Sequence, residues 1–153
     1  MDVNWLTHCV PQRITAHLHE LVLAMDGFAD RVLTSRFSAD YNLFVFLNPL
    51  LEASLDVTRL AERLNLTKAA VSKRVPVLER GGWLRTSSDP GHGRRVVVSL
   101  TPRGIALVTD AGTLLAERFE EMLAGLAIDS QRLDRDLVAM IPAVRALSAE
   151  ERS

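Results

Sequence analysis

The chain has 153 residues, of which 48% are hydrophobic, and its formal net charge is −1. This length suits one ordinary domain with a real core, and no run of 18 apolar residues is present that could span a membrane. The single cysteine, Cys9, excludes an internal disulfide framework, and the N-terminus has no signal-peptide pattern, so we expect a cytoplasmic protein. No Cys or His residues have the spacing of zinc ligands, and we expect neither a metal nor a cofactor.

Net positive charge is confined to residues 67–103. This segment carries eight Lys and Arg and two acidic side chains, whereas the remainder carries ten basic and 17 acidic ones. Such a distribution is expected when one surface meets phosphates and the rest keeps the protein soluble. A solvated basic face without a partner would produce the same charge pattern.

The first predicted element is a long helix that follows Pro11. Its apolar residues recur at steps of three and four, which is a heptad seam: Ile14, Leu18, Leu21, Met25, Phe28 and Val32. A second helix is predicted over residues 39–52, and Pro49 should kink it or end its regular hydrogen bonding. A short third helix over residues 56–64 would be capped by Asp56.

A fourth helix should begin after a tight turn at Asn65-Leu66, with Thr67 as its cap. It would direct Ala70, Val71, Val75 and Leu78 inward, and Gly81-Gly82 would end it, because glycine readily adopts the left-handed conformation. Residues 83–85 and 96–100 are predicted to pair as two antiparallel strands, since turn-forming residues occupy 87–93 between them.

Two further helices complete the pattern. Thr101-Pro102 predicts the start of a long helix that reaches residue 126, and a final helix over 133–147 would be interrupted by Pro142. The apolar surface along the terminal helices is larger than a monomer of this size can easily bury. This favours packing against a second subunit over an intramolecular bundle. We therefore expect a mainly α fold with a small antiparallel β-hairpin wing: a winged helix-turn-helix lobe over 38–100 between dimerisation segments 1–37 and 101–153.

Two short helices, a tight turn and a basic hairpin are typical of DNA-binding proteins, because the major groove admits the second helix of such a pair. The first turns of that helix carry polar Thr67, Lys68, Ser72 and Lys73. Small Ala69 and Ala70 would let it approach the bases. At the hairpin, the arginines at 94 and 95 could reach the adjacent minor groove, whose negative potential attracts arginine.

Three segments resemble the MarR family of bacterial transcription regulators: DVTRLAERLNLTKAAVSKRV at 56–75, LERGGWL at 78–84, and RRVVVSLTPRG at 94–104, with Asp89-Pro90 between the last two. The resemblance implies a homodimer with intertwined terminal helices, a palindromic site on double-stranded DNA, a sequence-specific regulator of the repressor kind, and release by a small-molecule signal such as an aromatic effector. Together with the helix-turn-helix pattern it predicts these DNA-binding residues: Thr67, Lys68, Ala69, Ser72, Lys73, Arg74, His92, Arg94 and Arg95.

Two positions depart from the family pattern. His92 stands where the family usually has an aspartate that orients the wing arginine, so we expect a more mobile wing. Pro76 lies inside the predicted recognition helix, where it removes one backbone hydrogen bond and should kink the helix.

Other classes of function remain open at this point. The chain has no P-loop, GxSxG, HExxH or glycine-rich dinucleotide turn, which argues against an enzyme. A winged-helix module that binds protein, such as an antirepressor, is the alternative to a DNA-binding regulator. Cys9 is either an oxidant sensor or an ordinary thiol, and His17 and His19 point in different directions on their helix, which disfavours a shared metal.

Overall fold

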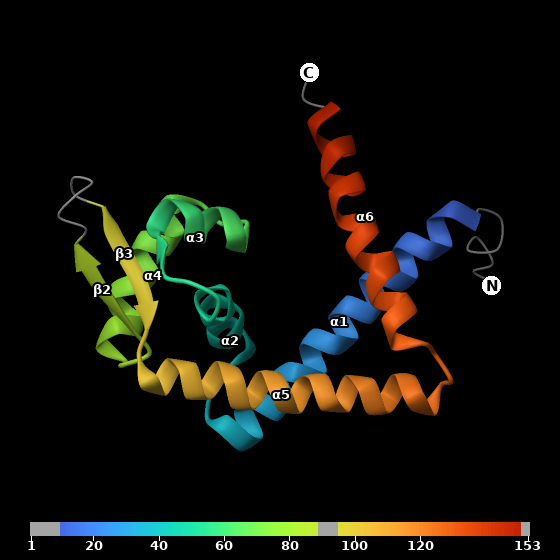
Figure 1. Ribbon diagram of the computed structural model, residues 1–153, viewed down its shortest axis with the longest axis horizontal. Helices are drawn as coiled ribbons and strands as arrows, with labels where there is room; N and C mark the ends of the chain where they lie inside the picture. Colours follow the sequence, from blue (N-terminus) through green and yellow to red (C-terminus); the bar gives the residue numbers. More distant parts are fainter. Residues whose placement is uncertain (1–9, 89–94, 151–153) are drawn as a thin grey trace, which may run out of the picture. The chain divides into compact units, whose positions relative to one another are not determined.

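The computed structural model describes residues 10–88 and 95–150 (Figure 1). The chain forms two compact units, Met1–Gly112 and Thr113–Ser153. No helix within the described ranges combines the length and the apolar character needed to cross a membrane.

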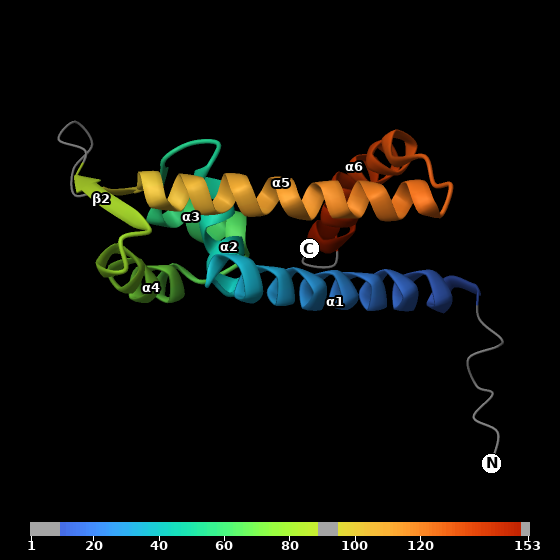
Figure 2. The same cartoon turned by 90° about the horizontal axis from the view of Figure 1, so that it is seen from below.

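The first unit begins with the long predicted helix, α1 (Val10–Phe37), which runs uninterrupted along its length (Figure 2). The second predicted helix is shorter than expected. α2 (Tyr41–Leu47) starts after its cap Asp40, and at Pro49 the chain tightens into the 3-10 turn η2 (Asn48–Leu50). The prediction that Pro49 ends the regular helix is confirmed, because a proline has no N–H to continue the α-helical bonding.

The helix-turn-helix follows with the predicted caps. α3 (Val57–Leu64) begins at Asp56, whose Oδ1 accepts the backbone N–H of Arg59 at 2.9 Å. Asn65 takes a left-handed conformation in the turn, and Thr67 Oγ1 accepts the N–H of Ala70 at 3.2 Å to start α4 (Lys68–Arg80). These side chains bind N–H groups that a helix start leaves without partners. α4 continues through Pro76 and ends at Gly81, and Gly82 then adopts a φ of +72° that favours glycine.

The predicted antiparallel hairpin is confirmed, and a short strand that was not predicted adds a third member to the sheet. β1 (Leu55–Asp56), β2 (Leu84–Ser88) and β3 (Val96–Leu100) lie in the order β1-β3-β2, all antiparallel. The strand predicted at 83–85 begins one residue later and extends to Ser88. β1 was missed because two residues are too few to display an alternating pattern.

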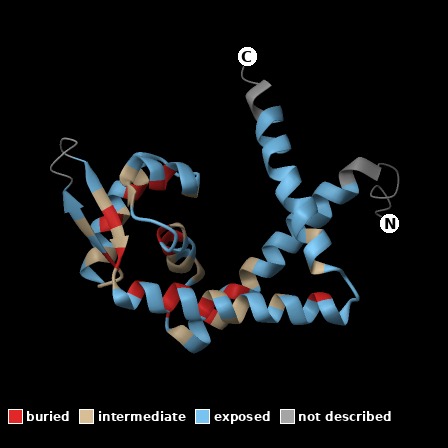
Figure 3. Cartoon of the chain, in the orientation of Figure 1, coloured by how far each residue is buried: buried red, intermediate tan, exposed pale blue. Residues whose placement is uncertain are grey.

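The core of this unit lies between α2, α3, α4, the sheet and the start of α5 (Pro102–Gly125), where the buried positions gather (Figure 3). Phe46, Leu60, Val71 and Val98 are almost completely buried there. The predicted inward face of α4 is confirmed, since Val71 and Val75 are buried and Leu78 packs against the same core. α3 contacts α4 and β1, and α4 contacts β2, so the core holds the helix-turn-helix against the sheet.

Gly104 marks the closest approach of α5 to the sheet. Thr101 Oγ1 donates to the carbonyl of Gly82 at 2.6 Å and accepts the N–H of Gly104 at 3.1 Å, which holds the start of α5 beside Trp83. A methyl group on Gly104 would overlap the Trp83 carbonyl oxygen. We expect Gly104→Ala to lower the free energy of unfolding by about 1–3 kcal/mol, since a backbone oxygen cannot rotate away.

A matched control is available on the same helix. A methyl group on Gly112 would meet only Phe44 Cζ, at 3.9 Å. Gly112→Ala should therefore stabilise the protein by up to about 1 kcal/mol through helix propensity. Urea unfolding of both variants measures the difference, and equal midpoints would contradict the close approach at Gly104.

The junction of α1 and α2 contains the only tyrosine in the sequence. Tyr41 Oη donates to Asp26 Oδ1 at 2.6 Å, and the Tyr41 N–H donates to Asp30 Oδ1 at 2.9 Å. Burial, followed by the hydrogen bond and the charge of Asp26, raises the pKa of Tyr41 to about 12. These contacts link α1 to α2 through a protonated phenol.

Because only one tyrosine is present, the near-ultraviolet absorbance of tyrosinate reports Tyr41 alone. We expect a midpoint near pH 12 in the folded protein, and a lower midpoint in Asp26→Asn. The unfolded chain loses this proton near the ordinary value of 10, so stability that is present below pH 10 is lost as pH rises toward 12. A midpoint near 10, with circular dichroism still native, would contradict the hydrogen bond between Tyr41 and Asp26.

The second unit holds the end of α5 and α6 (Ser130–Glu150). α5 ends at Gly125, and Ala127 then adopts a left-handed conformation. The predicted interruption at Pro142 was wrong, because α6 continues through this residue. The helix is exposed there, so water can bind the Val138 carbonyl that loses its N–H partner.

Candidate nucleic-acid interface

The first two turns of α4 present a polar surface. The cap of α4 and the turns after it expose the predicted recognition residues Thr67, Lys68, Ala69, Ser72 and Lys73. Val71, one position from Ser72, is completely buried. The amphipathic spacing of α4 therefore directs these five side chains away from the core.

Two of the basic side chains in the positive segment pack against the protein itself. The Arg74 guanidinium lies 4.9 Å from the centre of the Phe46 ring and donates to the Asn42 carbonyl at 3.5 Å. The Arg103 guanidinium lies 3.8 Å from the Trp83 ring and donates to the Gly81 carbonyl at 3.0 Å. Both cations gain contact with an aromatic face, so the net charge of the segment overstates its outward positive surface.

A carboxylate connects the end of α4 to the sheet. Glu79 Oε1 accepts the backbone N–H of Thr86 at 2.7 Å and its hydroxyl at 2.8 Å. Charge-assisted hydrogen bonds of this kind are roughly twice as strong as neutral ones. They position β2, and with it the β2–β3 pair, relative to the recognition helix.

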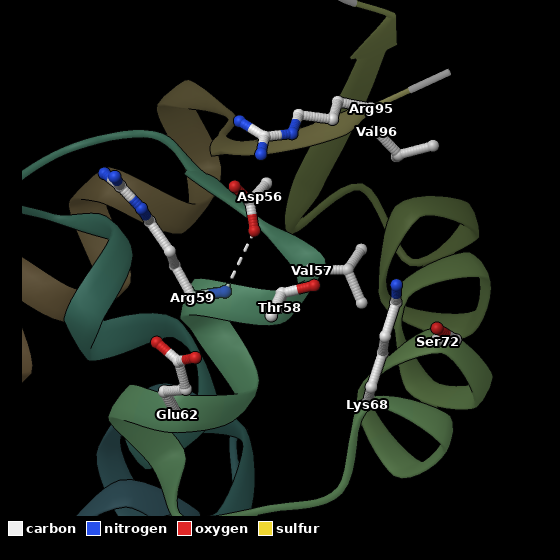
Figure 4. Close-up of a pocket in the computed structure, with 9 residues that line it drawn as sticks. All are labelled: Asp56, Val57, Thr58, Arg59, Glu62, Lys68, Ser72, Arg95 and Val96. Atoms are coloured by element: carbon white, nitrogen blue, oxygen red, sulfur yellow. Dashed lines mark hydrogen bonds between the residues drawn. The ribbon is translucent and has the colours of Figure 1, made fainter. Parts of the chain in front are cut away.

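A groove of about 550 Å³ lies between the start of α3, the start of α4 and residues 95–96, where the wing leads into β3 (Figure 4). Lys68 and Ser72 line it from α4, and Arg95 and Val96 line it from the wing. The remaining lining residues come from α3 and its cap: Asp56, Val57, Thr58, Arg59 and Glu62. Three cations and two carboxylates thus share one open groove.

Asp56 is the fixed anion of this groove. The N–H of Arg59 holds the pKa of the Asp56 carboxyl below its usual range, and the N–H of Thr58 and the charges of Arg95 and Arg59 act in the same direction against partial desolvation. The carboxylate therefore stays ionised at neutral pH and stays attached to the start of α3.

The groove brings together three of the predicted DNA-binding residues, Lys68, Ser72 and Arg95. Thr67, Ala69 and Lys73 are exposed on α4 but do not line the groove, and Arg74 packs against Phe46. Cys9, His92 and Arg94 lie outside the described residues. Among the residues that are described, no group of three His, Cys, Asp or Glu could hold a metal ion.

The sequence did not indicate that side chains of α3 line the groove. Asp56 was identified only as a cap, and Thr58, Arg59 and Glu62 were not identified at all. The cap signal at Asp56 could have indicated them, because the N–H groups of a helix start attract anions. No local signal indicates that the pairing of β1 with β3 places the start of α3 next to the wing.

A sequence model of the MarR family matches residues 42–95, which include most of α2 and all of α3, α4 and β2. The chain is also 33% identical over 91 residues to the transcriptional regulator AdcR of Streptococcus pneumoniae. That alignment covers 58% of this chain and 62% of AdcR, so the chain spans less than two thirds of the length of this relative.

Two solved structures have the same fold over most of their length. AbsC, a MarR family transcriptional regulator from Streptomyces coelicolor, matches with a TM-score of 0.76 at 18% identity, over 95% of this chain and 98% of AbsC. MepR from Staphylococcus aureus, solved in complex with DNA, matches with a TM-score of 0.68 at 22% identity, over 88% of this chain and 97% of MepR.

Proposed function

We propose that this chain is a transcription regulator of the MarR type that binds duplex DNA, because a MarR family model matches its helix-turn-helix and the solved MarR structures share its fold. The observation that carries the proposal is the groove in which Lys68 and Ser72 of the recognition helix meet Arg95 of the wing. A helix that exposes polar and small residues beside a basic wing suits a major groove and its flanking phosphates. The solved complex of MepR with DNA supports the same use of the fold.

The proposed contacts divide by position. Thr67, Lys68, Ala69, Ser72 and Lys73 face the major groove from α4. Arg95, together with His92 and Arg94 of the wing, reaches the backbone or the minor groove. Arg74 was predicted to bind DNA, but its position over Phe46 supports a different role, in which it holds α4 against α2.

We further propose that the protein acts as a homodimer on a palindromic site. The terminal segments 1–37 and 101–153 supply the contacts between subunits. This proposal is supported by the apolar side chains that α1 leaves exposed, such as Ile14 at 61% and Leu21 at 44%. Two recognition helices would then lie about 34–36 Å apart, one turn of B-DNA.

Repression, and release by a small aromatic effector in the cytoplasm, complete the proposal and rest on the family resemblance. An effector alters DNA affinity only if it binds two arrangements of the recognition helices with unequal affinity. A ligand that bound both arrangements equally would change nothing.

The test is a binding titration of the purified full chain with the DNA upstream of its own gene, at increasing salt and against a generic duplex. We expect selective binding that weakens by about 10³–10⁵-fold between 50 and 200 mM salt if 6–10 phosphates are contacted. Equally weak binding to both duplexes, with little salt dependence, would contradict the proposal. It would favour a winged-helix module that binds protein.

A further inference from the structure

Arg95 and Asp56 come from separate segments of the chain, and both line the groove. In the β1–β3 pair Asp56 lies opposite Val97. Arg95 directly precedes β3 and lies two positions before Val97, so in the register of this pair it is a diagonal neighbour of Asp56. Figure 4 shows the Arg95 side chain extending over the groove toward the Asp56 carboxylate.

The Asp56 carboxylate is a rigid partner for a long arginine side chain. Its Oδ1 accepts the N–H of Arg59 at 2.9 Å, so the side chain cannot turn away without losing the cap of α3. No acidic residue lies within five positions of Arg95 in the sequence. Glu62, the other carboxylate of the groove, lies beyond the Arg59 backbone (Figure 4).

We propose that Asp56 is a positioning residue, which holds the Arg95 guanidinium over the groove that Lys68 and Ser72 also line. The inference rests on the proposed function, since its purpose is to direct a wing arginine to DNA. An unrestrained arginine loses rotamer entropy when it binds, whereas one already held over the groove loses less. Asp56 thereby both caps α3 and orients the Arg95 side chain.

The pairing is tested first without DNA, by carboxyl ¹³C NMR titration of Asp56 in the full chain. Arg95→Ala should raise the pKa of Asp56, because a nearby positive charge is removed. Arg85→Ala is the control, since Arg85 lies on β2 and donates to Ser99 Oγ at 3.3 Å. An unchanged pKa in Arg95→Ala would overturn the inference whether or not the protein binds DNA.

The consequence for DNA is tested by a double-mutant cycle with Asp56→Asn, because asparagine caps a helix about as well as aspartate. We expect Arg95→Ala to weaken binding to the specific site about tenfold in the wild-type background and less than about threefold in Asp56→Asn. Equal losses would mean that Arg95 acts independently of Asp56. If the wild-type protein binds no DNA, the proposed function fails and the positioning role fails with it, even where the titration shows the pair.

Discussion

Leu21→Glu is expected to dissociate the proposed dimer into monomers. Leu21 belongs to the heptad seam of α1 and is 44% exposed, which we explain by contact with the second subunit. In a symmetric interface each substitution occurs twice, and burying an unpaired carboxylate costs at least about 2 kcal/mol per copy. A total of about 4 kcal/mol would raise the dimer dissociation constant about 1,000-fold.

The matched control is Ala16→Glu, which introduces the same side chain on the opposite side of α1. Ala16 is exposed and lies outside the seam. Sedimentation equilibrium measures whether each variant is a dimer or a monomer. The proposal for α1 fails if Leu21→Glu remains a dimer, or if both variants dissociate to the same extent.

Ala69→Glu is expected to abolish specific DNA binding while the fold is retained. Ala69 is exposed in the first turn of α4, where a carboxylate interacts favourably with the helix dipole. On the DNA the same carboxylate would face phosphates and base edges, and such a like-charge contact costs several kcal/mol. We expect affinity to fall by about 100-fold or more.

The control for this prediction is Ala106→Glu, at an exposed position of α5 in the same unit. It changes the net charge equally but adds no charge to the proposed interface, so it should change DNA affinity by less than about threefold. Thermal unfolding should show that Ala69→Glu is as stable as wild type. Unchanged DNA affinity in Ala69→Glu would exclude the first turn of α4 from the interface.

The helices of this fold could be predicted from the chain because their signals are local. Asp56 and Thr67 cap the two helices of the helix-turn-helix as predicted, and Gly82 takes the left-handed conformation expected after α4. A cap binds N–H groups only two or three residues away, so its effect is already present in a short segment. The prediction at Pro142 was wrong because water replaces the N–H partner that proline removes from the Val138 carbonyl.

The candidate site was predicted in part. The exposed face of α4 followed from its amphipathic spacing, and the basic wing followed from composition. The position of Arg74 could not be predicted, since neither spacing nor charge indicates that its guanidinium lies over Phe46, 28 positions earlier in the chain. Charge identifies a basic segment, whereas packing decides which of its side chains face outward.

The helical elements, their caps, the inward face of α4 and the resemblance to the MarR family could all be predicted from the chain, because each depends on residues close together in it. Only the tertiary structure decided that β1 joins the sheet, that Glu79 holds Thr86, and that Asp56 and Arg95 share one groove. These contacts join residues from separate elements, and a strand of two residues is stable only when the core positions its partner. Asp56 belongs to both groups, since its cap is local and its place beside the wing arginine follows from the β1–β3 pairing.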